Sequence, residues 1–221
     1  MKYKGIIFDF NGVLLWDTQW HADAWREASM MKRGTPLTGE EWDRLKGRTN
    51  REFWPAVLKR KLSDSEINEL AEFKEKMYRD IARSKGRAFA LSPGAQELLD
   101  EVLRSGIPHT IATSSESGNV NFFIKSLDLG RWFDVDKVVY DDGTVPGKPA
   151  PDLYLRAAEK LSLAPPECVV IEDSKSGIEA AKRAGAGKII ALGPKKEHSE
   201  LRMWGADQVV ESLKELTMSD F

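Results

Sequence analysis

Short, mostly apolar runs that alternate with segments of helical periodicity constrain the fold of this chain more than any other feature. Each run has three to six residues, which suits a strand better than a buried helix. Their nearly unbroken apolar character predicts burial on both faces, as in a parallel sheet with helices above and below it. Right-handed crossovers then predict a doubly wound, Rossmann-like α/β core. The runs are Ile6–Phe8, Ile107–Ala112, Lys137–Tyr140, Cys168–Glu172 and Lys188–Leu192.

The segments between these runs carry signals of helix starts and ends. Residues 93–104 have a proline in the first turn, and Gly106 follows just past the last turn. Further helices are predicted near residues 120–127, 151–161 and 177–185. Strand–helix–strand units therefore account for most of the chain after residue 90.

One long segment breaks this alternation directly after the first strand. Residues 17–85 show only helical periodicity, and Ser63 with Glu66 forms a capping-box start for the last helix of the segment. An insertion of about 70 residues is too long for a simple crossover. We therefore expect a core of residues 1–16 and 87–221 and a separate α-helical cap of residues 17–86.

Composition excludes several classes of protein. The 33 basic and 35 acidic residues give a net charge of −2, whereas nucleic-acid-binding proteins typically have a strongly basic balance. The sole cysteine, Cys168, cannot form an internal disulfide and is interpreted as a small core residue. No apolar run reaches the roughly 18 residues of a membrane span, and the N-terminus lacks the pattern of a signal peptide. We expect a cytoplasmic protein, with a monomer favoured.

Polar residues gather where the predicted strands end, and ligands of doubly wound sheets bind at the carboxyl ends of strands. Taken singly, each has a structural explanation: a turn aspartate, a helix cap, a solvated loop lysine, or acids at a helix N-terminus. Together, in this order, they predict a phosphate site. The residues are Asp9 and Asn11, Thr113 to Ser115, Lys148 in a Gly/Pro-rich loop, and Glu172 with Asp173.

Four motifs carry a family resemblance: "FDFNGVL", "ATSS", "GKPAPDLY" and "VVIEDSKSGIEAAKRAG". Through them the sequence resembles the haloacid dehalogenase superfamily of phosphohydrolases, in particular its β-phosphoglucomutase-like members with an α-helical cap. The resemblance covers essentially the whole chain. It implies that Asp9 is a nucleophile that forms an aspartyl-phosphate.

The same resemblance implies the roles of the other motif residues. Mg²⁺ would be held by Asp9, the backbone carbonyl of Asn11 and Asp173, with Glu172 nearby or acting through water. Lys148 would pair with the nucleophile and with the phosphoryl oxygens. Further contacts to the phosphate would come from Thr113, from the backbone N–H of Ser114 and from Ser115.

Asn11 departs from the family pattern, because phosphatases of this family normally carry a second aspartate there as the general acid and base. An amide donates hydrogen bonds but does not transfer protons at neutral pH, and general acid–base catalysis contributes typically about 10²–10⁴-fold. Four interpretations remain open: a slow or specialised phosphohydrolase, a binder of phosphorylated ligands, an engineered trap, and an Asn-Gly amide that deamidates spontaneously to an aspartate. If the chain is a slow or specialised phosphohydrolase, an activated aryl phosphate should give a burst of product and an accumulating phospho-Asp9. Candidates for a replacement carboxylate are Asp17, Glu116 and Asp142.

The cap is expected to provide specificity, by resemblance. An ungapped match puts Asn50 where mutases of the family carry an arginine, which weakens a mutase interpretation, although Arg48 and Arg51 are neighbours. His21 matches a cap histidine that packs helices or contacts substrate, and Trp16 and Trp20 either pack or line the pocket. A metal-free dehalogenase is disfavoured by the acidic pair. The candidate cap contacts are His21, Lys46, Arg48, Thr49 and Asn50.

The sequence therefore predicts a Mg²⁺-dependent phosphohydrolase with a Rossmann-like core and a helical cap. Its expected substrate is a small phosphorylated metabolite, preferably a sugar phosphate by resemblance. A non-catalytic module that binds phosphorylated ligands is the alternative, and a phosphosugar mutase is less favoured.

Overall fold

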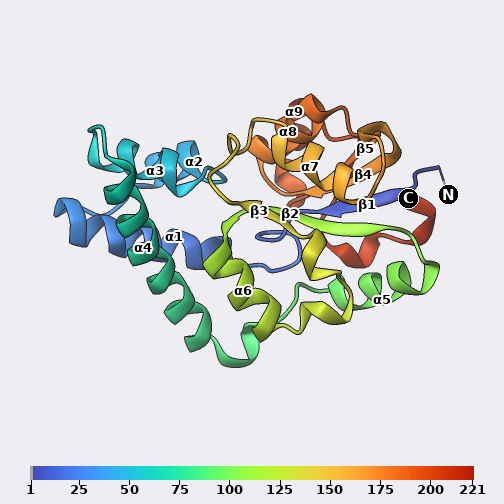
Figure 1. The fold of residues 1–221 in the computed structure, drawn as a ribbon, viewed down its shortest axis with the longest axis horizontal. Helices are drawn as coiled ribbons and strands as arrows, with labels where there is room; N and C mark the ends of the chain where they lie inside the picture. Colours follow the sequence, from blue (N-terminus) through green and yellow to red (C-terminus); the bar gives the residue numbers. More distant parts are fainter. Residues whose placement is uncertain (1) are drawn as a thin grey trace. The chain divides into compact units, whose positions relative to one another are not determined.

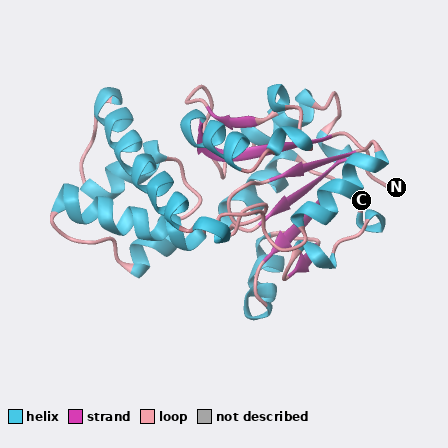
Figure 2. Cartoon of the chain, turned by 90° about the horizontal axis from the view of Figure 1, so that it is seen from below, coloured by secondary structure: helices cyan, strands magenta, loops and turns pink. Residues whose placement is uncertain are grey.

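The chain forms two compact units in a computed structural model that describes residues 2–221. One unit combines the residues up to Trp16 with Ala90–Phe221, and the other comprises Asp17–Phe89. The first holds all the named strands, and the second is helical (Figure 2). We refer to them as the core and the cap.

The core is built on one parallel sheet with the strand order β3-β2-β1-β4-β5-β6. The order reverses between β1 and β4, which is the topological switch point where doubly wound folds bind ligands. The α/β fold predicted from the apolar runs is thereby confirmed. The strands are β1 (Gly5–Phe8), β2 (His109–Glu116), β3 (Val139–Asp141), β4 (Cys168–Glu172), β5 (Lys188–Leu192) and β6 (Gln208–Val210).

Helices cover both faces of the sheet (Figure 1). Helices α7, α8 and α9 lie on one side, where their apolar faces pack with Ile7, Val170 and Ile189 in a continuous cluster. Helices α5 and α6 lie on the other side (Figure 1). The helices are α5 (Ala95–Ser105), α6 (Ser117–Ser126), α7 (Asp152–Lys160), α8 (Lys175–Ala184) and α9 (His198–Trp204).

Two features of the core differ from the sequence-based expectation. Strand β2 was expected over Ile107–Ala112, but it begins at His109 and continues to Glu116, because its polar end keeps pairing with β3. Strand β6 and helix α9 were not expected. Each of the other predicted strands is found within two residues of its predicted bounds.

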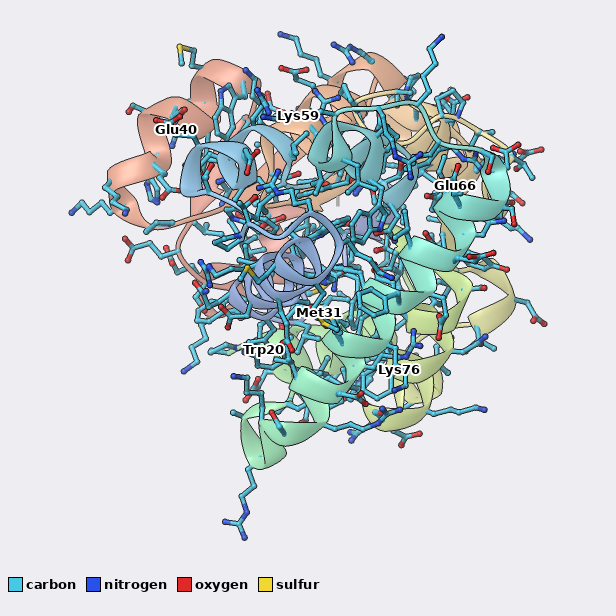
Figure 3. The ribbon with its side chains drawn as sticks, turned by 90° about the vertical axis from the view of Figure 1, so that its left-hand side faces the viewer. Trp20, Met31, Glu40, Lys59, Glu66 and Lys76 are labelled. Atoms are coloured by element: carbon cyan, nitrogen blue, oxygen red, sulfur yellow. The ribbon has the colours of Figure 1, made fainter. Side chains whose placement is uncertain are left out.

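The cap consists of four helices around an aromatic core. Trp25 stacks on Phe53 with ring centroids 3.7 Å apart, and Trp54 packs beside it. Ser63 and Glu66 form the capping box predicted at the start of α4. Charged side chains such as Glu40, Lys59 and Lys76 occupy its surface (Figure 3). The helices are α1 (Thr18–Arg33), α2 (Gly39–Leu45), α3 (Asn50–Leu58) and α4 (Asp64–Ser84).

Across residues 2–221, every helix is too short or too polar to cross a membrane.

Candidate active site

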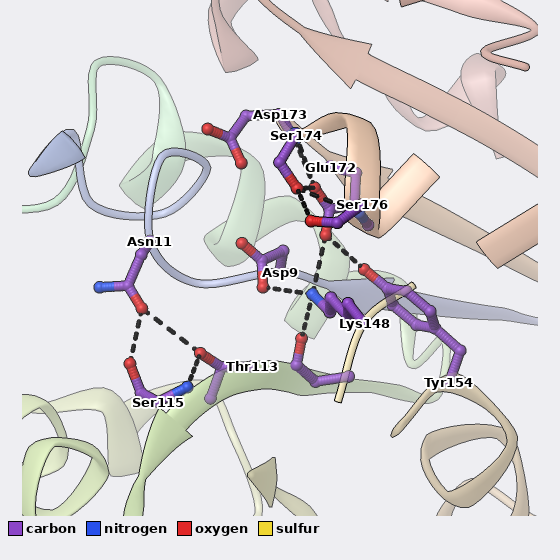
Figure 4. A network of polar contacts seen from close by, with 12 residues as sticks. Asp9, Asn11, Thr113, Ser115, Lys148, Tyr154, Glu172, Asp173, Ser174 and Ser176 are labelled. Atoms are coloured by element: carbon purple, nitrogen blue, oxygen red, sulfur yellow. Dashed lines mark hydrogen bonds and ion pairs between the residues drawn. The ribbon is translucent and has the colours of Figure 1, made fainter. Parts of the chain in front are cut away.

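Strand register places three residues of the core at one level of the sheet. Phe8 pairs with Ile111 of β2 and with Ile171 of β4, so Asp9 follows level with Ala112 and Glu172. Lys148, from the loop before α7, reaches all three. Its Nζ lies 2.7 Å from Asp9 Oδ1, 2.7 Å from Glu172 Oε1 and 3.2 Å from the Ala112 carbonyl oxygen (Figure 4). The three N–H donors of one ammonium group thus join three neighbouring strands at one level of the sheet.

The charges of this group are almost completely out of solvent. Lys148 is 2% exposed, Asp9 7% and Glu172 0%. Burial raises the pKa of Asp9 to about 7, with Lys148 opposing this shift and the charge of Glu172 adding to it. Burial alone would lower the pKa of Lys148, but the two carboxylates outweigh burial and raise it. Lys148 is therefore a fixed positive charge rather than a proton donor.

Glu172 accepts hydrogen bonds from five donors. Its Oε1 receives Lys148 Nζ and, at 2.8 Å, the Tyr154 hydroxyl; its Oε2 receives the backbone N–H of Asp173 and both the N–H and the hydroxyl of Ser174. Burial would raise the pKa of Glu172, but these donors, Lys148 first among them, lower it. Tyr154 was not predicted as a site residue. In the sequence it is only one more member of the apolar face of α7.

An acidic group that could hold a metal lies beside Lys148. Asp9, Glu172 and Asp173 each offer one oxygen within 4.8 Å of the others. Gly12 faces this group, because a Cβ built there would lie 2.1 Å from Asp173 Oδ2. Since Lys148 occupies only Oδ1 of Asp9, the other oxygen suits a hard cation. Oxygen donors of this kind fit Mg²⁺, with Glu172 holding the neighbouring groups in place.

Asn11 lies on the other side of Asp9 among hydroxyl groups (Figure 4). Its Oδ1 accepts the Ser115 hydroxyl at 2.8 Å and the Thr113 hydroxyl at 3.3 Å. The Thr113 hydroxyl also accepts the backbone N–H of Ser115. The buried hydroxyl oxygen of Ser114 hydrogen-bonds to no residue within 2–221.

The candidate replacements for a second carboxylate are engaged elsewhere or lie at a strand end. Asp17 belongs to the cap, where it accepts the hydroxyl of Tyr78. Asp142 is exposed and pairs with Arg156. Glu116 ends β2, level with Asp141.

The five candidate contacts of the cap differ in accessibility. The side chains of Lys46 and Arg48 are 42% and 43% exposed. Thr49 and Asn50 are buried at the start of α3, and Asn50 donates a hydrogen bond to Glu75 at 2.8 Å. His21 lies between Lys74 and Asp17 within the cap, with its Nδ1 2.9 Å from Lys74 Nζ.

The two aromatic candidates also differ, since Trp16 is 48% exposed while Trp20 packs edge-on against Phe89.

Comparison with known proteins places the chain among hydrolases. A family model described as haloacid dehalogenase-like hydrolase matches residues 3–185. A phosphorylated carbohydrates phosphatase of Thermotoga maritima is 34% identical over 190 residues, which cover 86% of this chain and 85% of that protein. A β-phosphoglucomutase of Bacillus subtilis is 31% identical, with 97% and 92% covered. The crystal structure of a HAD hydrolase, family IA, variant 3, from Entamoeba histolytica superposes with a TM-score of 0.89 at 38% identity, covering 98% of this chain and 96% of that one.

Proposed function

Since the chain belongs to the haloacid dehalogenase-like hydrolases and is a phosphoric monoester hydrolase, we propose that it acts on a small phosphorylated metabolite, with Mg²⁺ and through an aspartyl-phosphate on Asp9. The observation that carries this proposal is the bridge from Lys148 to both Asp9 and Glu172 at 2.7 Å. A buried cation beside a buried nucleophilic carboxylate offsets the repulsion that a phosphate dianion would otherwise meet.

Each residue then has a specific task in the reaction. Asp9 attacks phosphorus with one carboxylate oxygen while the bond from phosphorus to the leaving oxygen breaks. Lys148 favours the ionised form of the nucleophile against the effect of burial, and it would neutralise phosphoryl oxygens. The backbone N–H of Ser114 would donate a hydrogen bond to the transferred group, with Thr113 as the neighbouring contact. Water then attacks the aspartyl-phosphate, releases inorganic phosphate and restores Asp9.

Asp9, Asp173 and the backbone carbonyl of Asn11 would hold Mg²⁺, and Glu172 would orient Lys148 and the N-terminus of α8. When bound, the ion supplies positive charge to the phosphoryl oxygens and aligns them for attack. Gly12 supports this assignment because it leaves room for the Asp173 carboxylate.

Specificity is assigned to the cap, from Asp17 to near residue 86. A sugar phosphate is the preferred substrate, because the Thermotoga maritima relative is named for phosphorylated carbohydrates. Lys46 and Arg48 are the exposed candidates for substrate contact, whereas His21, Thr49 and Asn50 would shape the cap from within. The Asn50–Glu75 pair disfavours a mutase, since the position of the mutase arginine holds an amide bound to a carboxylate.

Phosphate release from a panel of phosphorylated sugars, with and without Mg²⁺, tests the proposal. The intact protein should release phosphate only with Mg²⁺, and Asp9→Asn should abolish release while leaving the melting temperature within a few degrees. Release that persists in Asp9→Asn would overturn the role of Asp9. Equal release in the presence of a chelator would overturn the role of the metal.

A further inference from the structure

The two proton-bearing side chains that contact Glu172 already direct their donors at groups of the protein. All three N–H donors of Lys148 are used, by Asp9, Glu172 and the Ala112 carbonyl. The hydroxyl of Tyr154 donates to the buried carboxylate of Glu172. In this geometry neither residue directs a donor at a leaving group.

The opposite side of Asp9 carries amide and hydroxyl groups. Ser115 and Thr113 both donate to Oδ1 of Asn11, and this fixes which end of the amide faces them. The amide nitrogen consequently points away from the two hydroxyls (Figure 4). The Asn11 amide and the two hydroxyls offer hydrogen-bond donors, and none of these three groups exchanges a proton near pH 7.

We propose that Asn11, oriented by Ser115 and Thr113, serves as a hydrogen-bond donor to the leaving oxygen, and that the enzyme therefore selects phosphates whose leaving oxygen is weakly basic. Phosphates on an anomeric, enol or acyl oxygen belong to this class, and phosphates on a simple alkyl alcohol do not. The inference rests on the proposed function and specifies its substrate class.

The step balances without an acid from the protein. A carboxylate oxygen of Asp9 forms a bond to phosphorus, and the bond between phosphorus and the leaving oxygen breaks. The electron pair stays on the leaving oxygen, which departs as an anion that accepts a hydrogen bond from Asn11 and takes a proton from water after release. Departure without a proton raises the activation barrier strongly for a basic alkoxide and only slightly for a weakly basic oxygen.

A series of monophosphates with leaving groups of graded acidity tests this inference. Values of kcat/KM with Mg²⁺ would be measured for 4-nitrophenyl, phenyl and glycerol phosphate, because this ratio reports the steps up to alcohol release. For the wild type we expect kcat/KM to fall steeply from 4-nitrophenyl phosphate to glycerol phosphate. Asn11→Asp should make this fall shallower. It should raise kcat/KM about 10²–10⁴-fold for glycerol phosphate and only slightly for 4-nitrophenyl phosphate.

Equal slopes in the wild type and in Asn11→Asp would overturn the inference, because another group would then be supplying the proton. A shallow slope in the wild type alone would also overturn it, whether or not Asn11→Asp folds. If neither protein releases phosphate from any ester, the proposed function fails instead, and the two failures are thereby distinct.

A double-mutant cycle tests the orienting role of Ser115 separately. Ser115→Ala should lower kcat/KM about three- to tenfold in the wild type, which matches the loss of one hydrogen bond. In an Asn11→Ala background the same change should have little effect, since there is no amide left to orient. Equal losses in both backgrounds would show that Ser115 acts on the substrate or the fold and not on Asn11.

Discussion

The hydroxyl of Tyr154 lies 2.8 Å from Oε1 of Glu172, the oxygen that also binds Lys148, and both side chains are completely buried. Tyr154 thereby helps to determine where the cation beside the nucleophile lies, although it is not expected to touch substrate. Helix α7 supplies it, and the same ring lies under Lys148 Nζ at 4.8 Å.

Tyr154→Phe should lower kcat about 5- to 30-fold with little change in KM, because it removes one hydrogen bond to a charged, buried group. Steady-state kinetics on the best substrate of the panel would measure this. Tyr140→Phe on β3 is the matched control and should leave both constants unchanged. A change in KM alone would contradict the positioning role.

Gly177→Ala should displace the carboxylate of Glu172, which lies directly against this glycine. A Cβ at this position would lie 1.6 Å from Glu172 Oε1, so the carboxylate must move away from Lys148 and Tyr154. We expect a loss of about 1–3 kcal/mol in the free energy of unfolding, together with a large loss of activity. Gly39→Ala is the control, since open space surrounds that glycine at the start of α2, and it should be neutral or slightly stabilising. Normal activity in Gly177→Ala would contradict the assigned role of Glu172.

A pH-dependent contribution to stability is expected in the cap. Arg33 donates to both oxygens of Glu41, at 2.9 and 2.6 Å, and holds the pKa of Glu41 at about 2, below its ordinary value of 4.5. Because the folded-state pKa is the lower one, the stabilisation is present above pH 4.5 and is lost as the pH falls towards 2.

Glu41→Gln should accordingly lower the melting temperature near pH 7, by the equivalent of roughly 1–3 kcal/mol, and by much less at pH 3. Glu40→Gln, one residue earlier on the exposed surface, should have little effect at either pH. An equal penalty for Glu41→Gln at pH 3 and pH 7 would show that the ion pair is not the cause.

Mg²⁺ should raise the melting temperature of the protein without any substrate. At a hundredfold excess over the dissociation constant the linkage amounts to about 2.7 kcal/mol. Asp173→Asn should remove this shift, whereas Asp128→Asn, on an exposed turn of the core, should retain it. A shift of the same size in Asp173→Asn would place the metal elsewhere.

The sequence was sufficient for the core fold because the central strands are buried on both faces and therefore uniformly apolar. Strands β4 and β5 have the bounds predicted for them. Strand β6 was missed because a run of three residues, Gln208–Val210, carries too little pattern to stand out. The extension of β2 to Glu116 was missed because extended polar residues look like a loop until their partner strand is known.

For the site, the sequence predicted which residues are present but not how they are connected. Lys148 was expected near Asp9 by resemblance, and its contact with the Ala112 carbonyl follows only from the register of β1 and β2. Tyr154 was missed because the helical spacing of apolar residues in α7 predicts a buried ring but does not say whether its hydroxyl has a hydrogen-bond partner. A hydroxyl-bearing ring on an otherwise apolar face is the signal that could have raised the question.

The strand order has a consequence for how the molecule loses structure. Thr113 lies on β2, Asp9 directly follows β1 and Glu172 ends β4. These three strands are adjacent, while β3 and β6 form the edges of the sheet. Fraying that begins at either edge leaves these three strands paired until the core itself opens. Amide hydrogens of Ile6–Phe8 should therefore exchange at the rate of global unfolding, and partial proteolysis at the sheet edges should yield species that retain the catalytic arrangement.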